Sequence, residues 1–425
     1  MEDYKTKHSM TPYAKHLLVL LVLYFNQMSA YVSVKYASYG NLIMCGMFAL
    51  AAAAFGYAFF ARRARLSWQA MALVLVLSAN LCLSMAFNGD LRGGYVLLAM
   101  NLAEALFFTA LFSREEFYRV YVNCLVVLSV LTFLTTYLAV PLLRLPILLP
   151  DTGARYYDAW VTLPQILPDE LRLNAVWFEP GVYALYLGFA LVLELFLNTS
   201  PSWFKVGVLT AAMLGTTSST GYVVLALLFC VLVADRIFRN RRSVRKMLAL
   251  SAAVLLACFA VAWFVPLEAL ERTFSKYDFR SLNFIGRFAP MLYNLEQGLR
   301  SPLFGLGFYS ERGFRVYYPF YKGMLYSNTA TTFQFFHFFG FAFPLFTCYA
   351  SWKMACAGRH KSLPVRLALA GILILNVNFE SVVLDQVYMI LLFSFFMKSE
   401  GKGKKDESAM VLRDADCLRL SGLRL

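Results

Sequence analysis

Charged residues are scarce in this chain of 425 residues: they make up 15% of it, whereas 60% of the residues are hydrophobic. A soluble globular protein carries about 25% charged and about 45–50% apolar residues, so that class is excluded. The scarcity of charge relative to apolar residues also excludes an intrinsically disordered chain. The net charge of +14 is compatible with a nucleic-acid partner. Long uncharged runs that recur along the whole chain instead predict a membrane protein with no nucleic-acid partner.

Cysteine and histidine are also few, with eight and four residues. No cysteine falls in a predicted outer loop, which excludes a disulfide framework, and the cysteine spacing matches no metal site. The cysteines are therefore interpreted as small core residues. We expect neither a metal nor a cofactor.

Twelve apolar runs predict twelve transmembrane helices, because a spanning helix needs roughly 20 mostly apolar residues. Such runs are too long for barrel strands, so the predicted fold is an all-α, polytopic membrane helical bundle. The first run follows a basic start, and we interpret it as an uncleaved span because no small-residue cleavage site follows it. The predicted spans are 17–34, 41–61, 69–87, 95–112, 120–143, 181–197, 203–219, 220–236, 247–266, 329–351, 363–379 and 381–397.

Lysine and arginine in the connections predict the orientation of the bundle. With an even number of spans, the basic clusters around Lys15, Arg62, Arg114, Arg236 and Lys398 all fall on one side. That side is predicted to be cytoplasmic and to hold both termini. The excess of positive charge is thus an orientation signal.

The chain divides into one transmembrane domain, 1–397, and a basic cytoplasmic tail, 398–425. Two outer connections are long. The first, about 144–180, is rich in proline and is expected to be irregular. The second, about 267–328, contains apolar residues at helical spacing over Leu282–Arg300, which predicts an amphipathic helix. Both loops are expected to pack on the outer mouth of the bundle.

Arginine dominates the basic residues of the outer side, where this topology places ten arginines and three lysines. A guanidinium binds phosphate or carboxylate through two parallel hydrogen bonds. The excess of arginine over lysine therefore predicts an anionic ligand at the outer leaflet. The alternative for any single arginine is an ion pair with a neighbouring carboxylate.

Two short segments at the outer ends of the spans carry polar groups. Arg172 and Glu179 lie at the outer mouth of the sixth span, and Glu179 precedes a Pro-Gly step that starts a helix. Glu179 can therefore complement the helix dipole or act as a general base. The Ser/Thr-rich turn 216–221 separates the seventh and eighth spans, and its hydroxyls can satisfy free backbone groups.

A few polar residues fall inside the predicted spans. His337 lies in an aromatic run of the tenth span, as a hydrogen-bonded core group or as a direct participant. Glu104 lies midway along the fourth span, with Asn101 one turn earlier and Asn80 in the third span. A carboxylate in lipid is functional by default, and a structural pairing of these helices is the alternative.

Three sequence motifs follow one another between Arg172 and Gly307. An Arg precedes an aromatic-Glu-Pro-Gly step, a Ser/Thr-Gly turn follows one helical hairpin later, and a large outer loop carries an Arg-bearing helix followed by Ser301–Gly307. Together, over about 172–345, they resemble the O-antigen polymerase and O-antigen ligase group of bacterial polysaccharide enzymes.

The polymerases of this group also show an Arg, ten residues and then a Gly in outer loops. Arg287 and Gly298 have that spacing, whereas Gly181 follows Arg172 too early. The ligases place a His before an Asn near the outer start of a late span. Asn328 follows a serine instead, which favours a polymerase.

The resemblance implies a GT-C-like fold in a bacterial inner membrane and a glycosyltransferase. It would join undecaprenyl-pyrophosphate-linked oligosaccharide repeat units at the periplasmic face and release undecaprenyl pyrophosphate. Expected partners are this lipid-linked oligosaccharide, membrane lipid, a chain-length regulator and a flippase. The predicted catalytic residues are Arg287, Arg172, Glu179 and His337. The predicted substrate-binding residues are Arg300, Arg280, Asn294, Gly305, Gly307 and Asn328.

Two alternatives stay open. One is an O-antigen ligase, which transfers the glycan to a lipid A core. The other is a flippase for lipid-linked oligosaccharides. A transporter usually has repeated halves and midplane polar residues on broken helices. This chain has no recognisable repeat and gathers its polar residues in two unequal outer loops.

Overall fold

The computed structural model describes residues 11–399, except 62–63, 65, 90–92, 144, 150–154, 160, 168–169, 199, 240–281, 309–313, 319–320, 326–329 and 359–361. Only the backbone is described for 166–167, 170–171, 237–239, 282–288, 314–318 and 321–325. The predicted span 247–266 therefore lies outside the described residues, as do Arg280 and Asn328.

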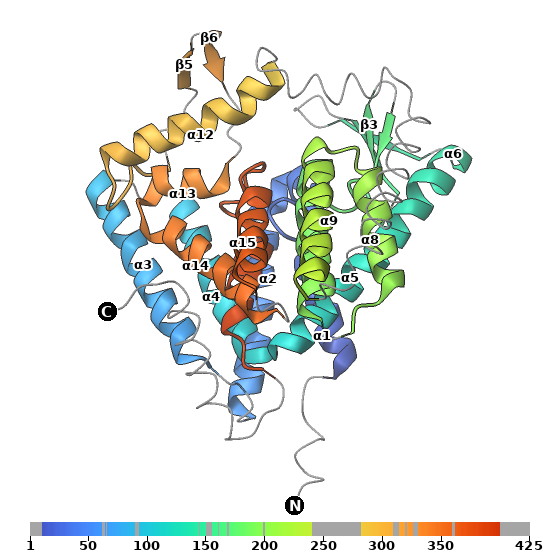
Figure 1. The fold of residues 1–425 in the computed structure, drawn as a ribbon, viewed down its shortest axis with the longest axis horizontal. Helices are drawn as coiled ribbons and strands as arrows, with labels where there is room; N and C mark the ends of the chain where they lie inside the picture. Colours follow the sequence, from blue (N-terminus) through green and yellow to red (C-terminus); the bar gives the residue numbers. More distant parts are fainter. Residues whose placement is uncertain are drawn as a thin grey trace, which may run out of the picture.

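The described chain is mostly helical, as predicted, and two small antiparallel sheets lie at one end of the helices (Figure 1). The helices are α1 (Pro12–Tyr24), α2 (Gly40–Phe60), α3 (Trp68–Asn88), α4 (Gly93–Leu111), α5 (Arg114–Leu134), α6 (Val140–Leu142), α7 (Pro180–Val192), α8 (Trp203–Gly215), α9 (Ser219–Arg239), α12 (Leu282–Arg300), α13 (Thr331–Phe339), α14 (Ala342–Ala357), α15 (Leu363–Val377) and α16 (Gln386–Phe393). Short π- and 3-10 turns extend several of them: η1 (Tyr31–Lys35), η2 (Ala37–Tyr39), η3 (Thr135–Ala139), η4 (Leu193–Leu197) and η6 (Ser394–Phe396).

Within the described residues, six helical segments are long and apolar enough to cross a membrane. Four shorter apolar helices coincide with the first, seventh, eleventh and twelfth predicted spans. The chain is thus a multi-pass membrane protein, and the count of twelve spans stays a prediction. Nearly every residue of α7 is buried, so α7 is central to the bundle. The six long segments are Ala37–Phe60, Trp68–Asn88, Gly93–Leu111, Arg114–Leu142, Pro180–Leu197 and Ser219–Arg236.

The prediction of an irregular first loop was wrong. It contains a four-stranded sheet in the order β1 (Ile147–Leu148), β2 (Arg155–Tyr157), β3 (Gln165–Leu167), β4 (Glu170–Arg172). Prolines directly flank these strands, at 146 before β1 and at 164 and 168 around β3. Proline cannot donate to a strand ladder but is tolerated at strand ends, so it limits the length of these strands without preventing them.

The second outer loop also departs from a purely helical description. The predicted amphipathic helix is confirmed as α12, with the predicted bounds, and it lies over α13 at the end of the bundle that carries the sheets (Figure 1). After it, β5 (Phe314–Tyr318) and β6 (Tyr321–Leu325) pair as an antiparallel hairpin. The fold is therefore helical with two small sheets, and not strictly all-α.

The tenth predicted span, 329–351, is two helices instead of one. The break is at Gly340, whose φ is +71°, and its backbone lies against Pro302 and Leu303. The Phe341 amide donates to the Pro302 carbonyl over 2.9 Å. The segment after α12 therefore occupies the break between α13 and α14, a long-range contact that hydropathy does not report.

The first predicted span, 17–34, also ends early, since α1 stops at Tyr24. The Ala30 amide donates to the Val176 carbonyl over 2.7 Å, and the Phe178 amide donates to the Met28 carbonyl over 3.2 Å. Pairing with the segment before α7 thus replaces helical hydrogen bonds in this stretch.

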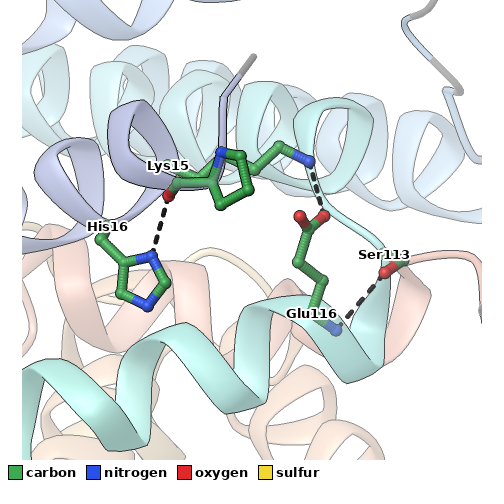
Figure 2. Close-up of polar contacts among 5 residues, drawn as sticks. Lys15, His16, Ser113 and Glu116 are labelled. Carbon is green, nitrogen blue, oxygen red and sulfur yellow. Dashed lines mark hydrogen bonds and ion pairs between the residues drawn. The ribbon is translucent and has the colours of Figure 1, made fainter. Parts of the chain in front are cut away.

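The opposite end of the bundle gathers basic residues that were predicted to share one side. Lys15 of α1 forms an ion pair of 2.6 Å with Glu116, and the Ser113 hydroxyl caps α5 by accepting from the Glu116 amide (Figure 2). The Arg114 amide donates to the Lys398 carbonyl over 3.0 Å. The shared placement of Lys15, Arg114 and Lys398 is confirmed, and its cytoplasmic identity stays a prediction.

Candidate functional site at the outer mouth

The segment from Arg172 to Glu179, here called the strap, joins β4 to the start of α7. Buried Asn174 holds it: the Asn174 amide group donates to the carbonyls of Leu163 and Trp177 over 2.8 and 2.7 Å, and its side-chain oxygen accepts from the Gln165 amide. Since buried polar groups need partners, this asparagine fixes the strap against the sheet. Arg172 and Glu179 are therefore held at the two ends of a rigid connection.

Arg172 is half-buried at the end of β4 and reaches the turn between α8 and α9. Its Nε donates to the Thr217 hydroxyl, and its Nη2 donates to the Thr217 carbonyl over 2.9 Å. Thr217 has a φ of 48°, an uncommon conformation for a non-glycine residue. The guanidinium thus connects the outer sheet to the α8–α9 hairpin and stabilises a strained turn.

Two hydroxyls of this turn, those of Thr216 and Ser218, bond to the backbone, as predicted. The Thr216 hydroxyl donates to the Met213 carbonyl over 2.7 Å and accepts from the Ser218 amide, and the Ser218 hydroxyl accepts from the Gly221 amide. They replace helical hydrogen bonds lost at the junction. Gly221 also lies against Ala184, which places the turn beside the first turns of α7.

Glu179 is exposed at the position just before α7. Its side chain makes no capping hydrogen bond to the helix. Tyr156 lies nearby, and its hydroxyl donates to the Phe178 carbonyl over 2.7 Å. Burial and, as the smaller cause, the charge of Glu179 together raise the pKa of Tyr156 to about 12. Tyr156 is therefore a neutral hydrogen-bond donor that orients the strap beside the Glu179 carboxylate.

A second carboxylate, which the sequence analysis did not single out, lies at the same place. Glu380 is in the connection between α15 and α16, and its carboxylate contacts the backbone of Gly181 in the first turn of α7. Its signal in the sequence is a lone acidic residue between two apolar runs at a predicted outer turn. The structure thus brings Glu179 and Glu380 to one helix end.

His337 and Asn294 lie between α12 and α13. His337 Nδ1 is 2.7 Å from Asn294 Oδ1, so with the amide oxygen as acceptor Nδ1 carries the proton. Both side chains are fully buried, and Tyr293 contacts the imidazole edge-on. Gly298 allows close packing of the two helices, because a Cβ there would be 2.3 Å from the Phe336 ring. This geometry is that of a hydrogen-bonded core histidine.

We expect Asn294→Ala to lower the melting temperature of the protein. The variant leaves a buried imidazole N–H without its acceptor, which costs about 1–3 kcal/mol. Thermal melting in detergent measures the effect, with Leu295→Ala, on the exposed side of α12, as the control. Equal melting temperatures for Asn294→Ala and the unmodified protein would contradict a structural role for this pair.

Gly305 and Gly307 hold the segment after α12 against α13. Both have positive φ, at +68° and +77°. The Gly307 amide donates to the Phe338 carbonyl over 3.1 Å, and the Leu306 amide donates to the His337 carbonyl over 2.8 Å. The two glycines therefore serve packing in this structure, and their contact with a substrate stays a prediction.

Two of the predicted site residues, Arg287 and Arg300, lie on α12. Arg300 is exposed and forms an ion pair of 2.7 Å with Glu296 on the same helix, which is the alternative given for a single arginine. Arg287 lies on α12, whose first residues are described by their backbone alone. Among the described residues, no group of three or more His, Cys, Asp or Glu side chains could hold a metal ion.

Glu104 is buried in α4, and the two asparagines named with it bond to other segments. The Asn80 amide group donates to the Leu303 carbonyl, and the Asn101 amide group donates to the Leu384 carbonyl over 2.7 Å. These asparagines therefore connect α3 to the segment after α12 and α4 to the connection between α15 and α16.

The fold and the candidate site define an integral membrane protein with a cluster of polar side chains at the end of the helical bundle that carries the sheets. Residues 205–343 match the family model described as O-antigen ligase. This match confirms the resemblance to the O-antigen polymerase and ligase superfamily, a group of glycosyl-transferring membrane enzymes. It includes the α8–α9 turn, α12 and α13, and it ends before Glu380. Neither the comparison with curated proteins nor that with solved structures finds a match.

Proposed function

We propose that this protein is a polysaccharide polymerase that joins lipid-linked oligosaccharide repeat units at the outer face of the membrane. The observation that carries the proposal is the strap, which holds Arg172 against the α8–α9 turn and Glu179 beside the start of α7. The turn belongs to the part of the chain that matches the family model. A cationic and an anionic side chain at one outer mouth suit a reaction with an anionic leaving group and a hydroxyl nucleophile.

The proposed reaction forms one glycosidic bond and breaks one bond to pyrophosphate. A sugar hydroxyl of the acceptor attacks the anomeric carbon of the donor glycan, and its proton passes to the Glu179 carboxylate. The bonding electrons of the anomeric carbon–oxygen bond leave with undecaprenyl pyrophosphate. Arginines stabilise the negative charge that develops there. We assign this role to Arg172 and Arg287, with Arg300 and Arg280 as substrate-binding residues.

The position of histidine supports a polymerase over a ligase. The position before Asn328, where the ligases have their histidine, is occupied by serine. His337 is buried between α12 and α13 and bonds to Asn294, so it is well placed to hold the helices together. The second candidate is a ligase that transfers glycan to a lipid A core, and the match to the O-antigen ligase family model favours it.

Deletion of the gene from its source strain tests the proposal through the glycans that accumulate. We expect single repeat units outside the membrane, because units would be exported but not joined. Complementation with the unmodified gene is the control. Complete polymer still attached to its lipid carrier would indicate a ligase. Lipid-linked units confined to the cytoplasmic face would indicate a flippase, and either result would overturn the proposed function.

A further inference from the structure

The exposed side of α12 carries a row of leucines, whereas an asparagine is buried on its other side. Leu292, Leu295 and Leu299 follow one another at helical spacing and are 50%, 38% and 61% exposed. Asn294 is fully buried against α13, where it bonds to His337. A helix that packs on a protein in water does the reverse, because it buries its apolar stripe. The arrangement on α12 therefore indicates an apolar medium around the three leucines, here called the leucine edge.

A charged edge runs beside the leucine edge on the same exposed side of α12. It consists of Glu296 and Arg300, which form an exposed ion pair of 2.7 Å one turn apart. The exposed side of the helix is thus divided along its length into an apolar and a charged half. This division is typical of helices that lie in a membrane surface, with the apolar edge at the acyl chains and the charged edge in water.

The leucine edge is joined to the exposed side of α14. Gly298, one turn from Leu295, packs so closely on Phe336 that a Cβ there would be 2.3 Å from the ring. The centroid of the Phe336 ring is in turn 4.6 Å from that of Phe341, which is 44% exposed just before α14. Leu345, one turn further along, is also exposed. Apolar side chains therefore continue from α12 along α14.

A second connection leads to α3, one of the helices that are long and apolar enough to cross a membrane. Leu303, just after α12, is exposed, and its carbonyl accepts from the Asn80 side chain of α3 over 3.3 Å. The next residue, Phe304, stacks on Phe87 of α3 with ring centroids 4.3 Å apart, and Phe87 is itself exposed. One end of α12 lies at the end of α3, and α12 runs at an angle to α9 and α15 (Figure 1). The leucine edge is therefore continuous with the exposed apolar side of a candidate membrane span.

We infer that α12 lies in the surface of the lipid bilayer, with its leucine edge at the acyl chains and its charged edge in water. The leaflet is the one on the side of the sheets, which the predicted topology makes the outer leaflet. This inference goes beyond the proposed reaction and does not depend on it. It places the backbone of α12 at the depth of the lipid phosphates, where the proposed lipid-linked substrate carries its pyrophosphate.

A bilayer fits this surface better than two other apolar partners. A site for a single polyprenyl chain is concave, whereas the leucines protrude from the convex side of a helix. A second copy of the chain would have to cover the exposed side of α3 as well, because Phe304 and Phe87 make the two surfaces continuous. Crosslinking distinguishes the three partners.

Photo-crosslinking of the full-length protein in vesicles of phosphatidylethanolamine and phosphatidylglycerol tests the placement. Benzoylphenylalanine replaces Leu299, and mass spectrometry identifies the products. We expect severalfold more phospholipid adduct than with the same replacement of Arg300, on the charged edge. Replacement of Leu75, which is exposed midway along α3, is the positive control. Equal phospholipid adducts at positions 299 and 300 would overturn the inference, as would a crosslinked dimer or a polyprenyl adduct as the main product at position 299.

Two double variants test the medium around the leucine edge through stability. Alanine and glutamine have similar helix propensities, so they are nearly equivalent on a helix face in water. In lipid the glutamine amide loses its hydrogen bonds to water and is unfavourable. We therefore expect Leu292→Gln with Leu299→Gln to melt at a lower temperature, in the same vesicles, than Leu292→Ala with Leu299→Ala. Equal melting temperatures for the two double variants would show that the leucine edge faces water and would overturn the inference.

Discussion

Replacement of Arg172 by alanine is expected to abolish polymer while the protein remains in the membrane. A preorganised cationic donor at a developing oxyanion accounts for about 100- to 1000-fold in rate. Arg172→Lys should recover little of this activity, because lysine cannot reproduce the two parallel hydrogen bonds of the guanidinium. Glycan chain length in the deletion strain, together with immunoblots of the membrane fraction, measures the result.

The Arg172 experiment needs a control for the turn that this residue also stabilises. Thr217→Gly removes the hydroxyl that Arg172 contacts but tolerates the φ of 48° at this position. If Arg172 acted only as a clamp on the turn, Thr217→Gly would weaken the same clamp, and both variants would mainly reduce the amount of protein. Full-length polymer in Arg172→Ala, at normal protein levels, would refute a role in the reaction.

Features that depend on local periodicity could be predicted from the sequence. The apolar spacing in 282–300 predicts α12 with its observed bounds, because the apolar residues of a helix of this length form a clear stripe along one face. The Ser/Thr-Gly turn between α8 and α9 is equally local, since its hydroxyls serve the adjacent backbone. The placement of Arg172 and Glu179 just before α7 follows from the apolar run that begins after them.

Features that depend on contacts between distant segments could not be predicted. The strands of the first loop are two or three residues long, too short to show an alternating pattern. The break at Gly340 exists because residues 302–303 pack against it. The contact between Gly181 and Glu380 joins two segments about two hundred residues apart, and neither residue identifies its partner. Each local motif thus supplies only some of the site residues, and the fold brings the motifs together.

Two parts of the chain carry the candidate site residues, and different interactions hold each part in place. On one side the strap, α7 and the α8–α9 turn hold charged side chains. On the other side α12, the segment after it and α13 are held by glycines and by the His337–Asn294 hydrogen bond. The family-model match includes this second part. Its tight packing implies that the glycine contacts fix the position of α12 against α13.

Gly305→Ala tests this dependence and is expected to have the largest effect on stability. A Cβ at Gly305 would lie 2.2–2.3 Å from backbone atoms of Phe338 and Phe339, which cannot rotate away, and the φ of +68° is itself unfavourable for alanine. Overpacking and backbone strain together cost about 2–6 kcal/mol. We expect a lower melting temperature and a parallel loss of polymer. Gly371→Ala, on α15, where a Cβ meets no atom within 4 Å, is the control and should change neither. If Gly305→Ala lost activity but melted normally, the glycine would serve the substrate and not the packing.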